Sequence, residues 1–323
     1  MEQQMESTRF VRFKCSYLRI ILPMMILWSV SMDAHTQSNR VMVRQWGEFG
    51  DRPGQFKYPT MMATDRTGNI LVVDQHNHRI QKFDAEGNFI LMWGRQGTNP
   101  GEFQYPYGIA VNSLGEVYVS DMNNHRIQKF SSDGTFISSA GVYGDGPGHF
   151  KYPYGLAVDD GDVLYVIDAF NYRIQKFDPD FGFLSEWGSE KEIGFRLYMP
   201  HEIVIDRNGN VILSDRQNHR ISIFSANGVL VKRFGGYGEG EDTGGGLFSE
   251  PHGVAVGDDG SLFVSDRYNF RIQHFDSTFH FLSGWMTSGS CDDSSHYPLG
   301  IAVGNDGTVY VSDHYAHCVQ QYK

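Results

Sequence analysis

The stretch PYGIAVNSLGEVYVSDMNNHRIQKF, residues 106–130, contains three short apolar runs separated by turn residues. Apolar and polar side chains alternate along the run HRIQKF, as they do in a half-buried β-strand. A fourth run, residues 135–140, follows the turn sequence SSDG. The stretch therefore predicts four antiparallel strands, which we name a, b, c and d in chain order.

The same pattern recurs along the chain. Six apolar runs end in an aspartate, and the successive aspartates are Asp74, Asp121, Asp168, Asp215, Asp266 and Asp313. They lie 47 residues apart, except that one interval is 51 residues because of a Gly-rich insertion at residues 240–246. Four antiparallel strands repeated six times are typical of a β-propeller. The sequence predicts an all-β fold, a six-bladed β-propeller of four-stranded antiparallel blades.

The two ends of the repeat array complement each other. The sixth copy ends after its strand c, residues 318–323, and a surplus strand at residues 41–47 precedes the first copy. This surplus strand is similar to the strands d at residues 89–94 and 183–188. We expect it to complete the last blade, which closes the ring and removes an exposed sheet edge. The predicted propeller domain is 41–323.

Residues 1–40 form a leader outside the repeats. Basic residues precede the apolar run at residues 20–32, and small residues follow it. This is the layout of a secretory signal peptide, and the run is short for a membrane span. We therefore expect a secreted or extracellular protein. The alternatives are a membrane anchor made by an uncleaved leader and a cytoplasmic protein.

The net charge and the cysteine content bear on which ligands the protein is expected to bind. The formal net charge is −11, which makes nonspecific binding to nucleic acid or anionic membranes less expected. The chain has three cysteines, Cys15, Cys291 and Cys318, and no C-x-x-C pair. Whether Cys291 and Cys318 pair is left open.

The repeated motif resembles the NHL repeat. The resemblance is carried by G-x-F-x-Y-P-x-G-I-A-V, then V-Y-V-x-D, then N-x-R-I-Q-K-F, and it covers residues 41–323. The family includes the substrate- or RNA-binding ends of tripartite-motif ubiquitin ligases, many secreted proteins and a zinc-dependent peptide-amidating lyase. The resemblance therefore implies the architecture and leaves the function open.

The motif D-x-x-N-x-R lies at the turn between strands b and c in five copies. We interpret its Asp and Arg as a structural pair across the turn and its Asn as a turn cap, because a motif repeated around a ring needs no ligand to explain it. The pairs are Asp74/Arg79, Asp121/Arg126, Asp168/Arg173, Asp215/Arg220 and Asp266/Arg271.

Function is expected where the copies differ. The residue after the strand-a proline and the residue after each repeated Asp are predicted to surround the central channel, on the face that carries the b–c and d–a loops. Two arginines, three histidines and two tyrosines at these positions suit an anionic group. The ligand-binding candidates are Tyr107, Tyr154, His201, Arg216, His252, Arg267 and His314. Alternatively, the arginines only pair with acids such as Glu202 or Glu250.

Signatures of catalysis are scarce. No G-x-S-x-G, H-E-x-x-H, Walker or dinucleotide motif occurs in its required context. The amidating lyase has Pro-His dipeptides at strand a on three blades, whereas here only His201 and His252 match, on adjacent copies. A catalytic zinc takes three protein ligands, so these two histidines form an incomplete set unless His314 or Glu202 completes it. Paired acids such as Asp258 and Asp259 could attract calcium, but solvated turns explain them. We expect no catalytic residue and no cofactor.

The sequence therefore favours a non-enzymatic binding or scaffold propeller that recognises a protein or a small anionic ligand on its b–c/d–a loop face. One alternative is an intracellular substrate- or RNA-recognition module similar to those of NHL-containing ubiquitin ligases. The chain has no RING or B-box Cys/His array, so it would be the recognition half only. The third hypothesis is a zinc-dependent lyase similar to the peptide-amidating lyase. We expect a protein partner before a small anion or RNA, and membrane contact only through an uncleaved leader.

Overall fold

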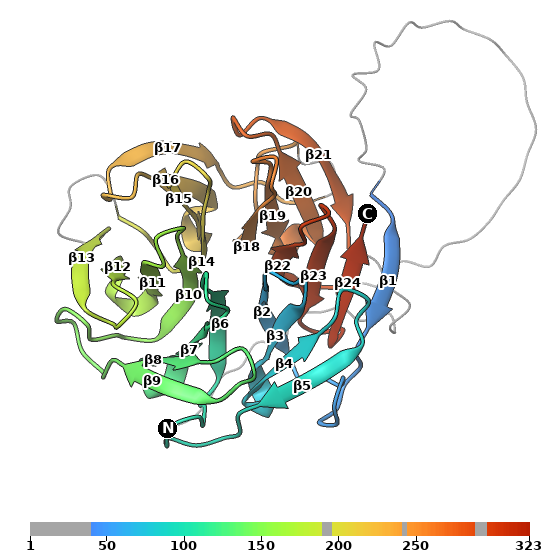
Figure 1. Ribbon diagram of the computed structural model, residues 1–323. Coiled ribbons are helices and arrows are strands. Elements are labelled where there is room, and N and C mark those ends of the chain that lie inside the picture. Colours follow the sequence, from blue (N-terminus) through green and yellow to red (C-terminus); the bar gives the residue numbers. More distant parts are fainter. Residues whose placement is uncertain (1–39, 189–195, 241–243, 288–295) are drawn as a thin grey trace, which may run out of the picture. The chain divides into compact units, whose positions relative to one another are not determined.

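The alternating apolar runs fold into the strands that their period predicts. The structure, a computed structural model, describes residues 40–188, 196–240, 244–287 and 296–323. Within these ranges the strands form six four-stranded antiparallel sheets. The sheets stand around a common axis, with strands a innermost and strands d outermost (Figure 1). The predicted six-bladed β-propeller is confirmed.

Strands a and b lie nearest the axis. Each strand a begins at a proline, and these strands are β2 (Pro59–Thr64), β6 (Pro106–Val111), β10 (Pro153–Val158), β14 (Pro200–Ile205), β18 (Pro251–Val256) and β22 (Pro298–Val303). Each strand b ends at the repeated aspartate, and these strands are β3 (Ile70–Asp74), β7 (Val117–Asp121), β11 (Leu164–Asp168), β15 (Val211–Asp215), β19 (Leu262–Asp266) and β23 (Val309–Asp313).

Strands c and d complete the blades. Strands c are β4 (Arg79–Phe83), β8 (Arg126–Phe130), β12 (Arg173–Phe177), β16 (Arg220–Phe224), β20 (Arg271–Phe275) and β24 (Cys318–Tyr322). Strands d are β5 (Phe89–Trp93), β9 (Phe136–Ala140), β13 (Phe183–Trp187), β17 (Leu230–Gly235), β21 (Phe281–Met286) and, for the last blade, β1 (Met42–Trp46).

Short helical turns connect strands b and c. In five blades one turn of 3₁₀ helix follows the aspartate: η1 (Gln75–Asn77), η2 (Met122–Asn124), η3 (Ala169–Asn171), η4 (Arg216–Asn218) and η5 (Arg267–Asn269). The next residue adopts a left-handed conformation, as at His78 with φ 54°. This reversal sends strand c back antiparallel to strand b.

The inner strands approach one another closely. A Cβ atom on Gly108 would lie 2.3 Å from the Tyr154 carbonyl oxygen, and one on Gly300 would lie 2.5 Å from the Thr60 carbonyl oxygen. These glycines therefore let the strands a of neighbouring blades pack backbone against backbone. The apolar core lies between blades; for example, Leu71 and Val73 of the first blade are in one buried cluster with Val117 and Val119 of the second.

The N-terminal strand closes the ring as expected. β1 pairs antiparallel with β24, from Met42 opposite Tyr322 to Trp46 opposite Val319. The backbone N–H of Val41 donates to the Lys323 carbonyl at 3.0 Å, and the N–H of Lys323 donates back at 3.1 Å. The last blade is thus built from both ends of the repeat array.

Some predictions fall outside this description. Residues 1–39 of the expected leader, Cys15 and Cys291 lie outside the described residues. Cys318 is buried in β24. Of the residues described, none forms a helix with the length and hydrophobicity that a bilayer crossing needs.

Removal of β1 should destabilise the whole propeller. Deletion of residues 41–47 exposes the edge of β24 and takes Trp46 away from the rings of Phe83 and Tyr310. We expect the melting temperature of a chain that starts at residue 48 to fall by on the order of 10 °C relative to one that starts at residue 40. Differential scanning calorimetry measures the difference, and equal melting of the two chains would contradict closure by β1.

Candidate functional site

A buried aspartate at the end of strand b organises each of the first five blades. In the first blade, Asp74 Oδ1 accepts from the backbone N–H of Lys57 at 2.7 Å. Its Oδ2 accepts from Arg79 Nε at 2.7 Å, Asn77 Nδ2 at 2.9 Å and Gln81 Nε2 at 3.0 Å. Both carboxylate oxygens are therefore occupied, which a buried carboxylate requires.

The same arginine holds the loop that enters the blade. The Arg79 guanidinium donates to the backbone carbonyls of Asp51, Arg52 and Gln55. The four other Arg–Asp pairs have Nε–Oδ2 distances of 2.7–2.9 Å: Arg126–Asp121, Arg173–Asp168, Arg220–Asp215 and Arg271–Asp266. Each pair lies within its own blade, so the protein itself supplies the partner of each repeated residue.

In the sixth blade a histidine side chain, in place of the arginine, contacts the aspartate. Cys318 occupies the position of the arginine, and Asp313 Oδ2 instead lies 2.8 Å from His296 Nδ1. His296 precedes strand a of this blade, 17 residues before the aspartate. Sequence reasoning missed this residue because it lies outside the D-x-x-N-x-R motif.

Four of the ligand-binding candidates close the central channel at the start of the inner strands. We call Tyr107, Tyr154, His201 and His252 the axial plug. The Tyr107 hydroxyl lies 2.6 Å from His201 Nδ1 and 3.2 Å from His252 Nε2. The rings of Tyr107 and Tyr154 stack with centroids 4.6 Å apart, and the two imidazoles lie 4.1 Å apart. Tyr107, His201 and His252 are all buried, so the plug is a packed polar cluster.

The donor and acceptor of each hydrogen bond in the plug can be assigned, starting from Arg216. Arg216 Nη1 lies 3.1 Å from His201 Nε2, and because arginine only donates, that nitrogen is the acceptor. His201 Nδ1 then carries the proton and donates to the Tyr107 hydroxyl, which donates to His252 Nε2. His252 Nδ1–H is left buried, with no hydrogen-bond partner among the described residues. Burial, together with the nearby arginines, lowers the pKa of His201 well below its ordinary value, and that of His252 likewise, so both rings are neutral at pH 7.

The other three candidates lie beside the plug. The Arg216 side chain pairs with the Glu250 carboxylate, with Nε 2.7 Å from Oε2, which is the alternative role considered for the arginines. The Arg267 guanidinium lies over the rings of Tyr268 and Tyr297, 4.9 and 5.6 Å from their centroids. His314 Nδ1 is 3.1 Å from the Pro59 carbonyl oxygen. The structure thus brings all seven candidates to one end of the axis, with the two arginines in different environments.

The plug offers little to a metal ion. In the described part of the chain, no group of three or more His, Cys, Asp or Glu side chains could hold one. His201 and His252 direct ring nitrogens at the Tyr107 hydroxyl.

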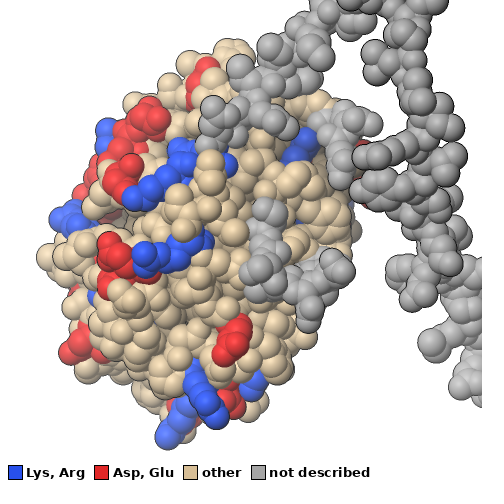
Figure 2. Space-filling view, turned by 90° about the vertical axis from the view of Figure 1, so that its right-hand side faces the viewer, with Lys and Arg blue, Asp and Glu red and all other residues tan. Residues whose placement is uncertain are grey.

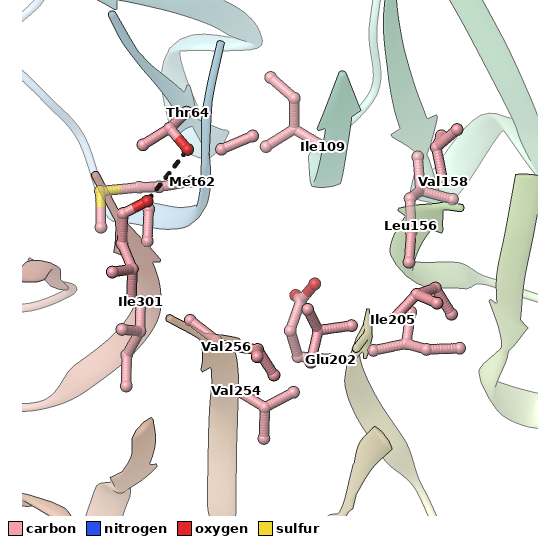
Figure 3. A pocket seen from close by; sticks show the side chains of 17 residues that line it. Met62, Thr64, Ile109, Leu156, Val158, Glu202, Ile205, Val254, Val256 and Ile301 are labelled. Carbon is pink, nitrogen blue, oxygen red and sulfur yellow. Dashed lines mark hydrogen bonds between the residues drawn. The ribbon is translucent and has the colours of Figure 1, made fainter. Parts of the chain in front are cut away.

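Next to the plug, the inner strands line a chamber that sequence reasoning did not identify. The cavity measures about 200 Å³ and is lined by aliphatic side chains of the inner strands, among them Ile109, Leu156, Val254 and Ile301 (Figure 3). Glu202 extends its carboxyl group into this space. It is 7% exposed, and no described residue makes a hydrogen bond to its Oε2.

The sequence did carry a signal for Glu202. Four copies of the repeat have glycine at its position, namely Gly108, Gly155, Gly253 and Gly300. Glu202 is thus the one ionisable residue in a row of inner-strand positions that pack close to the axis. Burial raises the pKa of its carboxyl well above the ordinary value.

The buried histidines should make the protein sensitive to mild acid. Burial lowers the pKa of His314 to about 4, against 6.5 ordinarily. Between these values the unfolded chain binds a proton that the folded chain does not, so folding stability falls as pH falls. We expect the contribution of His314 to lower the free energy of unfolding by on the order of 2 kcal/mol between pH 6.5 and pH 5. Urea denaturation of His314→Gln and the unsubstituted protein at both pH values measures it, and an identical pH dependence in the two proteins would contradict the assignment.

Comparison with known proteins agrees with this architecture. The family model described as NHL repeat matches residues 56–83, 103–130, 197–224, 248–275 and 296–322. The B-box type zinc finger protein ncl-1 of Caenorhabditis elegans is 51% identical over 45 residues, which are 14% of this chain and 5% of that protein. Protein brain tumor of Drosophila melanogaster is 49% identical over 45 residues, 14% of this chain and 4% of that protein. The chain therefore matches about a twentieth of the length of these relatives.

Solved structures share the fold at low sequence identity. Virginiamycin B lyase from Staphylococcus aureus is 14% identical with a TM-score of 0.60, over 87% of this chain and 98% of that chain. A gluconolactonase from Xanthomonas campestris is 14% identical with a TM-score of 0.63, over 84% and 87% of the two chains. These similarities show the propeller fold alone. Since the matches fall in register with five of the six observed blades, the chain carries NHL repeats and folds as one six-bladed β-propeller.

Proposed function

We propose that this propeller is a non-enzymatic binding module that recognises a protein partner on its loop face, the face formed by the b–c and d–a loops. The observation that carries the proposal is a set of exposed aromatic side chains on these loops. They are Phe49, Tyr143, Phe170, Tyr198, Tyr237, Tyr268 and Tyr315. Aromatic side chains that remain in water in a folded protein are typical of contact surfaces, because they bury a large area at little entropic cost.

Three of these rings occupy equivalent places in their blades. Phe49, Tyr143 and Tyr237 lie in the d–a loops and are 60%, 63% and 60% exposed. Each one leans on a histidine of a b–c turn, with ring centroids 4.9–5.0 Å apart. The rings are therefore held in place from one side and open on the other, as preorganised contact residues would be.

Charges on the loop face favour a protein over a polyanion. Several of its cations are matched by acids: Lys57 with Asp51, Arg95 with Glu102, Lys151 with Asp145, and Arg216 with Glu250. Acidic and basic side chains also adjoin one another on the side of the molecule that Figure 2 shows. A surface that binds a nucleic-acid backbone would instead carry an excess of basic groups.

Arg267 differs from these four cations. No carboxylate of the described residues pairs with it, and its buried Nε has no hydrogen-bond partner. Its guanidinium rests on Tyr268 and Tyr297 at the rim of the axial plug. It is the natural anchor for an acidic side chain of the partner, or for the small anionic ligand that the sequence suggested.

An intracellular recognition module for a substrate protein or RNA is the second candidate. It is supported by the 45-residue matches to ncl-1 and brain tumor, which cover one repeat's length of this chain. The loop-face aromatics would then stack on bases. The likeness to a lyase and a gluconolactonase supports no catalytic proposal, because it is a likeness of fold.

Loss of the three d–a loop rings should weaken partner binding without loss of stability. We expect the combined variant Phe49→Ser, Tyr143→Ser, Tyr237→Ser to capture at least about tenfold less partner than the unsubstituted protein, since aromatic anchors dominate interfaces. Photo-crosslinking followed by mass spectrometry measures capture of proteins, and ultraviolet crosslinking measures capture of RNA.

The matched control removes three apolar side chains of the outer strands that are also exposed, though somewhat less so. The variant Ile90→Ser, Leu184→Ser, Val231→Ser lies on β5, β13 and β17 and should retain capture. Equal losses in both variants would contradict a loop-face site, and capture of RNA in place of protein would favour the second candidate.

Secretion is a separate proposal, supported by the layout of residues 1–40. Expressed in a secreting host, the protein should reach the medium with a new N-terminus near residues 32–37. N-terminal sequencing tests this, and an intact Met1 in the cytosol would contradict it.

A further inference from the structure

The chamber next to the axial plug has the features of a binding site distinct from the loop face. Its walls are aliphatic side chains from all six inner strands, and Glu202 is the only ionisable residue among its lining residues. The carboxyl group points toward the centre of the space (Figure 3). A buried carboxyl oxygen with no hydrogen bond from the described residues lowers the stability of the fold. A bound ligand that donates a hydrogen bond to Oε2 would remove this cost.

Glu202 is not needed to build the strand. Its backbone N–H donates to Ser214 Oγ at 3.0 Å. In three other blades a glycine at the same position makes the equivalent hydrogen bond, to Ser120, Ser265 or Ser312. The side chain is therefore an addition to a backbone arrangement that is complete without it.

The chamber is closed at one end only. The axial plug closes it toward the loop face. At the other end, the last residues of the inner strands are partly exposed: Thr64, Val158, Ile205, Val256 and Val303. A ligand would therefore enter from the face of the a–b turns.

The rim at that end is acidic. The a–b turns carry the bases Arg66 and Arg207 and the acids Asp65, Glu116, Asp159, Asp160, Asp162, Asp206, Asp258, Asp259 and Asp306. Four of these acids pair with bases, namely Asp65 with Lys82, Glu116 with Lys129, Asp258 with Arg207 and Asp306 with Lys323. Excess negative charge around a narrow opening concentrates cations there. The rim and Glu202 thus favour the same sign of ligand.

The chemical character of the lining side chains and the volume of the chamber determine which kind of cation it can hold. A hard metal ion takes six or more oxygen ligands, counting water, whereas the side chains of the lining supply one carboxyl and the Thr64 hydroxyl among mostly aliphatic groups. The volume of about 200 Å³ equals the liquid volume of roughly six or seven water molecules. A short alkyl chain that ends in an ammonium group matches both the walls and the size.

We propose that the chamber binds a small primary alkylammonium ion, with its ammonium group on the Glu202 carboxylate and its alkyl chain against the aliphatic walls. Burial raises the pKa of the Glu202 carboxyl. An ammonium ion that binds to the protonated carboxyl displaces its proton to solvent. The proposal is independent of protein binding on the loop face.

The test uses n-butylammonium chloride and n-butanol, which differ in charge and little in size. Methyl resonances of Leu156, Val254 and Ile301 report on the chamber. We expect saturable shifts with butylammonium, at an affinity about ten- to a hundredfold higher than that of butanol. Sodium chloride at equal ionic strength should cause no shift.

Two substitutions of Glu202 separate binding from folding. Glu202→Gln should reduce the affinity for butylammonium about tenfold or more, to that of butanol. Glu202→Gly restores the residue of four other blades and should fold while losing the preference for the cation. The matched control Glu86→Gln removes an exposed acid and should bind as the unsubstituted protein does. Equal affinity for butanol and butylammonium, no shift with either, or unchanged binding by Glu202→Gln would overturn the proposal.

Discussion

The buried carboxylate at the end of strand b is the constraint on which the propeller depends. A desolvated carboxylate is tolerated only when its lone pairs are satisfied, and Asp74 meets this condition with four donors from three parts of its blade. The donors include the backbone of the d–a loop, which has little regular structure of its own. One charge therefore fixes the b–c turn, strand c and the chain that links the blade to its predecessor.

This constraint also sets where variation is possible. The residue after the aspartate and the residue after the strand-a proline do not take part in the repeated network, so they can differ between blades without loss of the fold. Arg216 and Arg267 occupy equivalent places, yet one pairs with Glu250 and the other rests on two tyrosine rings. The loop face thus has the same backbone arrangement in each blade but carries different side chains from blade to blade.

Most of the fold could be predicted from the sequence, because strand period, turn residues and the 47-residue spacing are local properties of the chain. The closure by β1 could be predicted as well, since a missing strand at one end matched a surplus strand at the other. The gathering of Tyr107, His201 and His252 followed from their common repeat position. Their contacts did not, because the choice between Glu250 and a ligand as the partner of Arg216 depends on side-chain packing between blades. The role of His296 and the direction of the Glu202 side chain could not be predicted from the sequence for the same reason.

The closure by β1 has a consequence for the synthesis of the chain. β1 leaves the ribosome long before its partner β24 is made, so it must wait without a hydrogen-bonding partner while the intervening blades form. The final blade then assembles in one late step that joins segments far apart in sequence, a slow type of contact. A nascent chain with a free strand and an open ring would be the species most in need of a chaperone. Once the two segments pair, the ring is closed, and neither terminal blade can unfold from its end without breaking this pairing.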